Sequence, residues 1–187
     1  MANGKSMATP SDGFNGLLAR LAASNVATAE HLHGCTAAEI AGLEARYRLR
    51  LPGSYRRYLE LMGHRSGRLF ACDHMAVFYR DVLEMTDDVY TRRIRAGKAR
   101  QNGDGWAPLA FSLPSDALFV ASRLDAQWQF IRCADQTDSP VWYFGEDDWS
   151  IRRVHACVLD WLNCWCGIAE EAIVSGYFEQ YPNGTTP

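Results

Sequence analysis

The clearest hydrophobic pattern of the chain lies in residues 34–63, which read GCTAAEIAGLEARYRLRLPGSYRRYLELMG. Thr36 followed three positions later by Glu39 has the spacing of a capping box, in which each side chain accepts a hydrogen bond from the other residue's backbone amide. Apolar side chains then recur at about one helical turn, at Ala37, Ile40, Leu43 and Tyr47. The pattern predicts a helix that ends near Arg50, because Pro52 disfavours a helical conformation in the residue before it.

A second, shorter helix is predicted after this turn, with Pro52 as its first residue, where the missing N–H costs no hydrogen bond. Its core face comprises Tyr55, Tyr58, Leu59 and Met62. Gly63 is placed to end it in the left-handed conformation. Two such helices cannot bury both apolar stripes against each other, so a sheet or a third layer must cover them.

Three further helices are predicted from the same periodicity. The first is short and has the apolar residues Phe14, Leu17, Leu18 and Leu21. The second runs from Asp81 to Lys98, with an apolar stripe of Val82, Leu83, Met85, Val89, Tyr90 and Ile94. The third begins at a Ser150 cap. Its narrow polar edge holds Asp160, Asn163, Gly167, Glu170 and Glu171, and its broad apolar face holds Val158, Trp161, Leu162, Trp165, Ile168 and Ala172.

Short apolar runs between turn residues predict strands at 68–72, 107–111, 117–121, 127–133 and 141–144, the later ones spaced like a meander. The order of elements predicts an α+β fold, a mainly antiparallel sheet with helices packed beside it. Residues 1–12 are small and polar and are expected to form a flexible tail. Residues 13–187 are expected to form a single domain.

Composition adds a charge asymmetry to this picture. The chain of 187 residues is 48% hydrophobic, contains six Trp and carries a net charge of -3. Residues 31–100 hold thirteen basic and eight acidic side chains, a balance of +5, whereas residues 101–187 hold four and twelve, a balance of -8. Such polarity bears on the choice of partners rather than on the fold.

The six cysteines form no CxxC pair, and no secretory segment is visible, because Arg20 interrupts the short apolar run of residues 14–23. We therefore expect a cytoplasmic protein with reduced cysteines. No run of residues is apolar enough to cross a membrane, since the most apolar one, residues 154–174, contains Asp160, Asn163, Glu170 and Glu171.

The Gly-Cys-Thr-x-x-Glu-Ile-x-x-Leu-Glu run, the Leu-Pro turn, the aromatic helix and the closing Gly resemble the N-terminal signature of the SUKH superfamily, which includes the yeast regulators of the Smi/Knr type. The matching residues are Gly34, Glu39, Ile40, Leu43, Glu44, Leu51, Pro52, Tyr55, Leu59 and Gly63. The strand-rich middle and the late 140–144 strand before a helix fit the family's plan. The Gly usually doubled after the second helix is here Gly63-His64. The resemblance implies an immunity protein, because bacterial members mostly neutralise secreted toxins, often nucleases or nucleic-acid deaminases.

Acidic turns and aromatic side chains crowd around the late strand. This candidate partner-binding set comprises Asp116, Asp125, Asp135, Asp138, Trp142, Glu146, Asp147, Asp148 and Trp149. Rigid aromatics can anchor an interface and charge can steer encounter, although turns are generally polar and strand aromatics generally face a core. The resemblance favours binding, because a toxin that acts on nucleic acid presents a basic cleft that an acidic partner can block.

Other chemistries are weaker. His31, His33 and Cys35 lie close together, but zinc usually takes four ligands in two spaced pairs, and no second pair follows, so we expect no metal and no cofactor. Cys72 with Asp73 and His74, or Cys157 with His155 and Asp160, could form a Cys/His hydrolase, but on a helix His155 and Cys157 would point to different sides. The arginines of residues 46–68 are expected on solvated helix faces rather than on nucleic acid, since the pI is about 5.9.

The sequence thus predicts a non-enzymatic immunity protein that binds a cognate toxin and occludes its active site. The first alternative is a regulatory scaffold for protein–protein interactions, as the yeast relatives suggest. The second is an unrecognised Cys/His hydrolase. Fold and motif do not by themselves decide among them.

Overall fold

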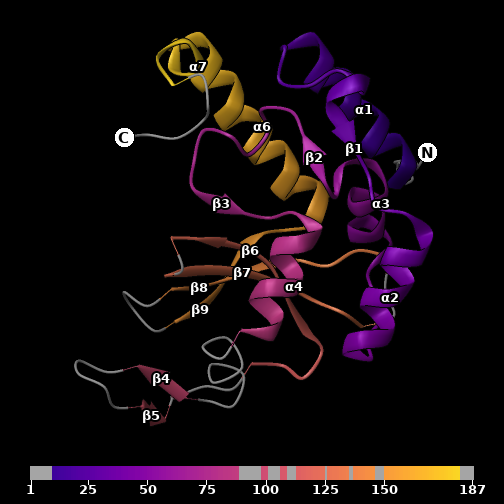
Figure 1. Ribbon diagram of the computed structural model, residues 1–187, viewed down its shortest axis with the longest axis vertical. Coiled ribbons are helices and arrows are strands. Elements are labelled where there is room, and N and C mark those ends of the chain that lie inside the picture. The colour runs from indigo at the N-terminus through magenta and orange to yellow at the C-terminus, as the bar shows by residue number, and fades with distance from the viewer. Residues whose placement is uncertain are drawn as a thin grey trace, which may run out of the picture.

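The computed structural model describes residues 10–88, 98–100, 106–108, 113–124, 126–134, 137–145 and 150–181. It shows an α+β fold, as predicted, with a five-stranded antiparallel sheet and helices beside it (Figure 1). The described part of the chain contains no helix that is both long and apolar enough to cross a membrane.

The two signature helices form as predicted, with small shifts at their ends. Helix α2 spans Ala37–Tyr47 and is opened by the capping box: the Thr36 hydroxyl accepts from the Glu39 amide at 3.2 Å, and the Glu39 carboxylate accepts from the Thr36 amide at 2.7 Å. It ends three residues earlier than expected, because Arg48 adopts a left-handed conformation with φ 54°. Helix α3 spans Gly53–Met62, and Pro52 caps it rather than starting it.

The core stripes of α2 and α3 are confirmed in the main. Leu43 and Tyr58, the central residues of the two stripes, are fully buried. Ala37 is exposed and Tyr47 is half-buried, so the stripe of α2 is narrower than the sequence predicts. The predicted face of α3, from Tyr55 to Met62, is buried throughout.

Gly63 corrects a sequence prediction. Its backbone is right-handed, with φ -67° and ψ -17°, and not left-handed. The reason for glycine here is close packing: a Cβ atom would lie 2.5 Å from the Cys35 sulfur and 2.7 Å from the Leu59 carbonyl oxygen. Gly34 is packed against α3 in the same way, because its Cβ would overlap the Glu60 carbonyl. The absence of a side chain at both signature glycines therefore lets the segment before α2 pack closely against the end of α3.

The main sheet has the order β3-β6-β7-β8-β9, with every neighbouring pair antiparallel. Its strands are β3 (Met75–Ala76), β6 (Ala117–Arg123), β7 (Gln127–Arg132), β8 (Val141–Gly145) and β9 (Ile151–His155). The predicted meander is confirmed in β6, β7 and β8. Helix α4 packs against β6, which is buried along nearly its whole length.

Strand β9 was not expected, because the sequence predicts that the last long helix begins at Ser150. Residues 151–155 instead pair with β8, and the Arg152 guanidinium lies over the Tyr143 ring, its neighbour across the ladder, at 4.6 Å. Helix α6 (Val158–Val174) begins after the extended Cys157. A short helix, α7 (Tyr177–Gln180), follows it.

Two other predictions are wrong near the middle of the chain. Residues 68–72 form turns rather than a strand. Gly67, just before them, has φ +63°, and the adjacent side chains of Leu69 and Phe70 are both buried, whereas a strand would point them to opposite faces. Strands β1 (Leu32–His33) and β2 (Arg65–Ser66) pair instead.

Helix α4 spans Tyr79–Asp87, so it begins two residues before the predicted 81–98 and ends well before Lys98. The Asp81 carboxylate starts it by accepting from the amides of Val77 and Phe78, and Asp88 is extended and ends it. Lys98–Arg100 forms strand β4, paired with β5 (Trp106–Pro108). Val89, Tyr90 and Ile94 lie outside the described residues.

Helix α1 spans Pro10–Ala23, so the last three residues of the predicted tail belong to its first turn. Phe14, Leu17 and Leu21 are buried. A 3-10 turn, η1 (Ala29–His31), connects α1 to β1. Helices α1 and α6 lie side by side beyond one end of the sheet (Figure 1).

Candidate partner surface

Three of the nine predicted partner-binding residues lie in the part of the chain that the structure describes: Asp116, Asp138 and Trp142. The other six lie outside the described residues: Asp125, Asp135, Glu146, Asp147, Asp148 and Trp149. Asp116 and Asp138 lie at the same end of the main sheet, and Trp142 lies within β8. Each of them is held by other parts of the fold.

Asp138 joins three segments through a single carboxylate oxygen. Its Oδ1 accepts from the Ser54 hydroxyl at 2.5 Å, the Ser139 amide at 2.7 Å and the Val158 amide at 3.2 Å. Ser54 is in the first turn of α3 and Val158 begins α6, so this carboxylate faces the starts of two helices. The carboxylate satisfies a free amide only at α6, through Val158, and its negative charge is favourable at the positive end of each helix dipole. Asp138 is therefore a structural cap.

Asp116 is also occupied. Its carboxylate accepts from Arg132 Nε at 2.5 Å, and its backbone carbonyl accepts from the Cys133 amide at 2.7 Å. The two side chains of the ion pair are partly exposed, and pairs of this kind add little stability. The pair nevertheless neutralises the Asp116 charge, which weakens its use as an isolated anion for a partner.

Trp142 is half-buried in β8 and packs against the core, with its ring stacked on Phe130 at 6.4 Å and 14°. Its indole nitrogen is buried without a hydrogen-bond partner. A buried indole N–H without a partner is unusual and costs free energy. The ring is thus mainly a core side chain, which is the ordinary role of a strand aromatic.

The strand register separates the predicted residues into two groups. Arg123, Gln127 and Gly145 are aligned across β6, β7 and β8, so they mark one end of the sheet. Asp125 follows that end of β6, and the acidic run 146–148 follows Gly145. Asp116 and Asp138 instead belong to the opposite end, where Ala117 aligns with Arg132. We call these the Gly145 end and the Asp138 end.

Three of the seven arginines in residues 46–68 are paired with carboxylates, which favours the solvated-face interpretation over a phosphate-binding patch. Arg46 pairs with Asp87, Arg56 with Glu44 at 2.7 Å and Arg57 with Glu60 at 3.2 Å. Each pair removes one positive charge from a surface that would have to attract phosphates.

The two Cys/His/Asp sets lack an activated thiol. Burial raises the pKa of Cys72, and Asp73 is already paired with Arg123 at 2.8 Å. Burial also raises the pKa of Cys157, whose sulfur accepts from the Asp160 amide as a cap of α6. A nucleophilic cysteine needs a lowered pKa. His155 lies in β9 and not on a helix with Cys157, so the expected angle between them does not apply.

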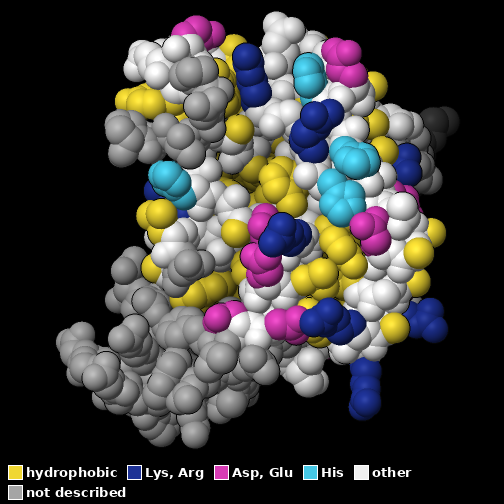
Figure 2. Space-filling view, in the orientation of Figure 1, with side chains coloured by type: hydrophobic (Ala, Val, Ile, Leu, Met, Phe, Trp, Pro, Cys, Tyr) yellow, Lys and Arg dark blue, Asp and Glu magenta, His cyan; other side chains and the backbone are white. Residues whose placement is uncertain are grey.

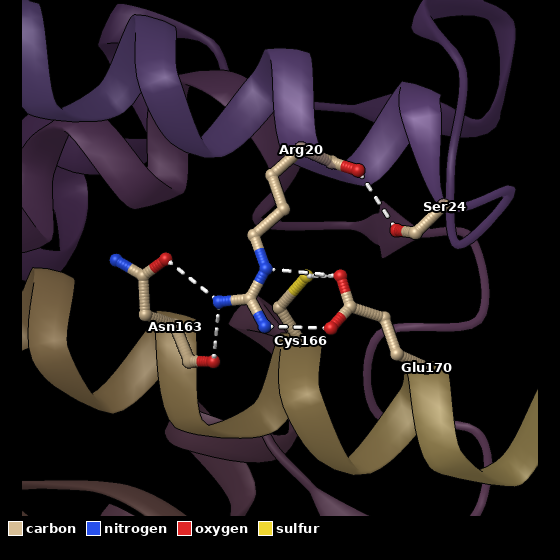
Figure 3. Close-up of polar contacts among 5 residues, drawn as sticks. All are labelled: Arg20, Ser24, Asn163, Cys166 and Glu170. Atoms are coloured by element: carbon tan, nitrogen blue, oxygen red, sulfur yellow. Dashed lines mark hydrogen bonds and ion pairs between the residues drawn. The ribbon is translucent and has the colours of Figure 1, made fainter.

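Outside the predicted set, α1 is fastened to α6 by one arginine. Arg20 donates from Nε and from one terminal nitrogen to the two carboxylate oxygens of Glu170, at 2.9 and 2.6 Å (Figure 3). Its other terminal nitrogen donates to the backbone and side-chain oxygens of Asn163. The hydrogen bond from Arg20 lowers the pKa of Glu170. The polar edge predicted for the last helix is therefore partly covered by α1, whereas Ile168 from the predicted apolar face is 39% exposed.

A group of potential metal ligands that the spacing of the sequence did not predict lies where α2, α3 and β2 meet. Ligand atoms of Cys35, Glu39 and His64 are within 4.8 Å of one another. Figure 2 shows histidine side chains gathered on the upper right of this face, with a carboxylate beside them. His64 follows α3 and is distant in sequence from the first two residues, so no local motif could reveal it.

The comparison with protein families identifies the class of protein. The model of the SMI1 / KNR4 family (SUKH-1) matches residues 34–164, which is more than half of the chain. The chain belongs to this family, as the signature residues predicted. The match begins at Gly34 and ends within α6, so α1 and the Arg20–Glu170 contact lie outside it. A search among curated proteins gave no significant match.

Proposed function

We propose that this protein is an immunity protein that binds a cognate protein toxin and occludes its active site without catalysing a reaction. Membership of the SUKH-1 family carries the proposal. The raised pKa of the Cys72 and Cys157 thiols supports a binding role over hydrolysis. A toxin with a basic cleft is the partner that suits the -8 balance of residues 101–187.

The Gly145 end of the sheet is the better candidate for the contact surface. At the Asp138 end the carboxylate is already used by α3 and α6. At the Gly145 end the chain carries Asp125 and the acidic run 146–148 close to the ends of adjacent strands. The acidic run places three carboxylates in succession in the sequence, and such a concentration of charge favours it as the steering group.

The test is coexpression with the toxin encoded beside the gene, measured both as survival of the host cell and as a purified complex. The proposal expects survival and an equimolar complex in which the toxin is inactive. A complex in which the toxin remains active indicates the scaffold alternative. Survival without a complex, together with cleavage of the toxin, indicates that the protein is a hydrolase instead.

A further inference from the structure

We propose that Cys35, Glu39 and His64 form a binding site for a single zinc ion. Cys35 lies just before α2, Glu39 lies in the first turn of α2, and His64 lies just after the end of α3. Their ligand atoms lie within 4.8 Å of one another, and the His64 Nε2 and Glu39 Oε1 atoms are only 3.1 Å apart. A thiolate, an imidazole and a carboxylate are the donor types that zinc takes in proteins.

The geometry needs little change to accept the ion. Zinc bonds of about 2.0–2.3 Å in a tetrahedral arrangement place neighbouring donor atoms about 3.3–3.8 Å apart. The histidine and glutamate atoms, 3.1 Å apart, must separate by only about 0.2 Å, and the sulfur must approach them by at most about 1 Å. Three protein ligands leave a fourth position for water.

The surrounding contacts orient each ligand. The capping box holds Glu39 by its Oε2 atom, which accepts from the Thr36 amide and hydroxyl, and this leaves Oε1 directed at His64. The His64 ring is flanked by the rings of His33 and Tyr79, at 5.4 and 5.6 Å. Such secondary contacts fix the direction of metal ligands.

The sulfur is placed by the backbone of α3. The Cys35 amide donates to the Leu59 carbonyl at 2.7 Å, and the absence of a side chain at Gly63 gives the sulfur its space. The side chain of Cys35 is buried, whereas those of Glu39 and His64 are 35% and 29% exposed. An ion can therefore reach the group from solvent while the thiolate stays on the protein side.

Binding has a definite proton balance. Burial, and then the nearby Glu39 charge, raises the pKa of Cys35 to about 12, so the thiol is protonated without the ion. Zinc replaces that proton, which passes to solvent, and no oxidation or reduction occurs. His64 binds through Nε2 as neutral imidazole, so the proton that Nε2 donates to Glu39 without the ion leaves this nitrogen, and the ring keeps its single proton on Nδ1 by exchange with solvent.

Cobalt(II) is the probe for this site, because it occupies zinc sites and its bond to a thiolate gives a charge-transfer absorption. With the full chain we expect that absorption to saturate at one cobalt per protein and to disappear when zinc is added. We also expect zinc at about one hundred times its Kd to raise the melting temperature by about 5–10 °C.

Four variants decide the assignment. Cys35→Ser and His64→Gln should each abolish the charge-transfer absorption and the zinc-dependent melting shift. Cys164→Ser, which removes the exposed cysteine, and His74→Gln should change neither. The proposal is overturned if wild type shows no absorption, if either of the first two variants keeps it, or if either control loses it. His64→Gln alters a partly exposed side chain, so it remains informative should Cys35→Ser fold poorly.

Discussion

The two ends of the five-stranded sheet differ in the acidic residues that the chain carries there. At the Asp138 end, one aspartate accepts three hydrogen bonds and connects the sheet to the starts of α3 and α6. At the Gly145 end, the strands lead into an acidic run that the sequence places beside Trp149. Asp138, which looks like any other turn aspartate in the sequence, therefore holds the fold, whereas the acidic run at the Gly145 end is the surface that we propose for the partner. The difference separates stability from binding, and the following experiments test that separation.

The largest effect on stability is expected from Asp138→Ala. It leaves the Val158 amide and the buried Ser54 hydroxyl without their acceptor, so the free energy of unfolding should fall by about 2–4 kcal/mol. Urea denaturation followed by circular dichroism measures this change. Asp138→Asn is the matched control, because it keeps an acceptor oxygen and should lose less. Equal losses in the two variants would mean that the charge, and not the hydrogen bonds, is what stabilises this end.

At the Gly145 end, substitutions are expected to weaken binding and to leave stability nearly unchanged. Reversal of Asp147 and Asp148 to Lys should slow association with the toxin by about tenfold at low salt and weaken protection, because these charges steer the encounter. The free energy of unfolding should change by no more than about 0.5 kcal/mol. Stopped-flow binding over a range of salt concentrations measures the rate.

Reversal of Arg46 and Arg50 to Glu is the control for this experiment. Arg46 is exposed and paired with Asp87, and both arginines belong to the α2 region. We expect little effect on protection. If the arginine reversal abolishes protection and the aspartate reversal does not, the toxin contacts the helical half, and the proposed surface is wrong.

Local patterns explain which elements could be predicted. The capping box of α2 and the apolar face of α3 are each complete within a few residues, so the local sequence pattern is sufficient to predict both helices. Strand β9 was missed because two of its five residues are exposed arginines and it leads directly into α6. Gly63 was assigned the wrong conformation because its role depends on Cys35, which approaches it only in the folded chain.

The candidate site could be predicted less well for the same reason. Asp138 lies in a turn, and nothing in its neighbourhood indicates that the first turns of α3 and α6 converge on it. The zinc ligand His64 is likewise separated from Cys35 by the whole of two helices. Composition could predict that the second half is acidic, but only the strand register assigns its carboxylates to one end or the other.

A smaller effect on stability is expected from Asp116→Asn. The Arg132 pair is partly exposed, so its loss should lower the free energy of unfolding by at most about 1 kcal/mol. If Asp116 serves only this pair, association with the toxin should stay within about twofold of wild type. A much slower association would show that the Asp138 end also contributes to binding, which would remove the distinction between the ends.

The smallest effect concerns pH and the contact between α1 and α6. The Arg20 hydrogen bond lowers the pKa of Glu170 in the folded chain, so the folded state favours the ionised carboxylate. The stabilisation is fully present above the pKa of Glu170 in the unfolded chain and is lost as the pH falls through the lower, folded value. Glu170→Gln should therefore lower the free energy of unfolding at neutral pH. In this variant the free energy of unfolding should also fall less steeply as the pH is lowered. Melting temperatures between neutral and strongly acidic pH measure the difference. Glu171 is exposed on the same helix and has no side-chain partner among the described contacts, so Glu171→Gln is the control and should leave the acid slope closer to wild type. An unchanged slope in Glu170→Gln would show that α1 is held by its buried Phe14, Leu17 and Leu21, and by the Arg20–Asn163 hydrogen bonds, without help from the Glu170 charge.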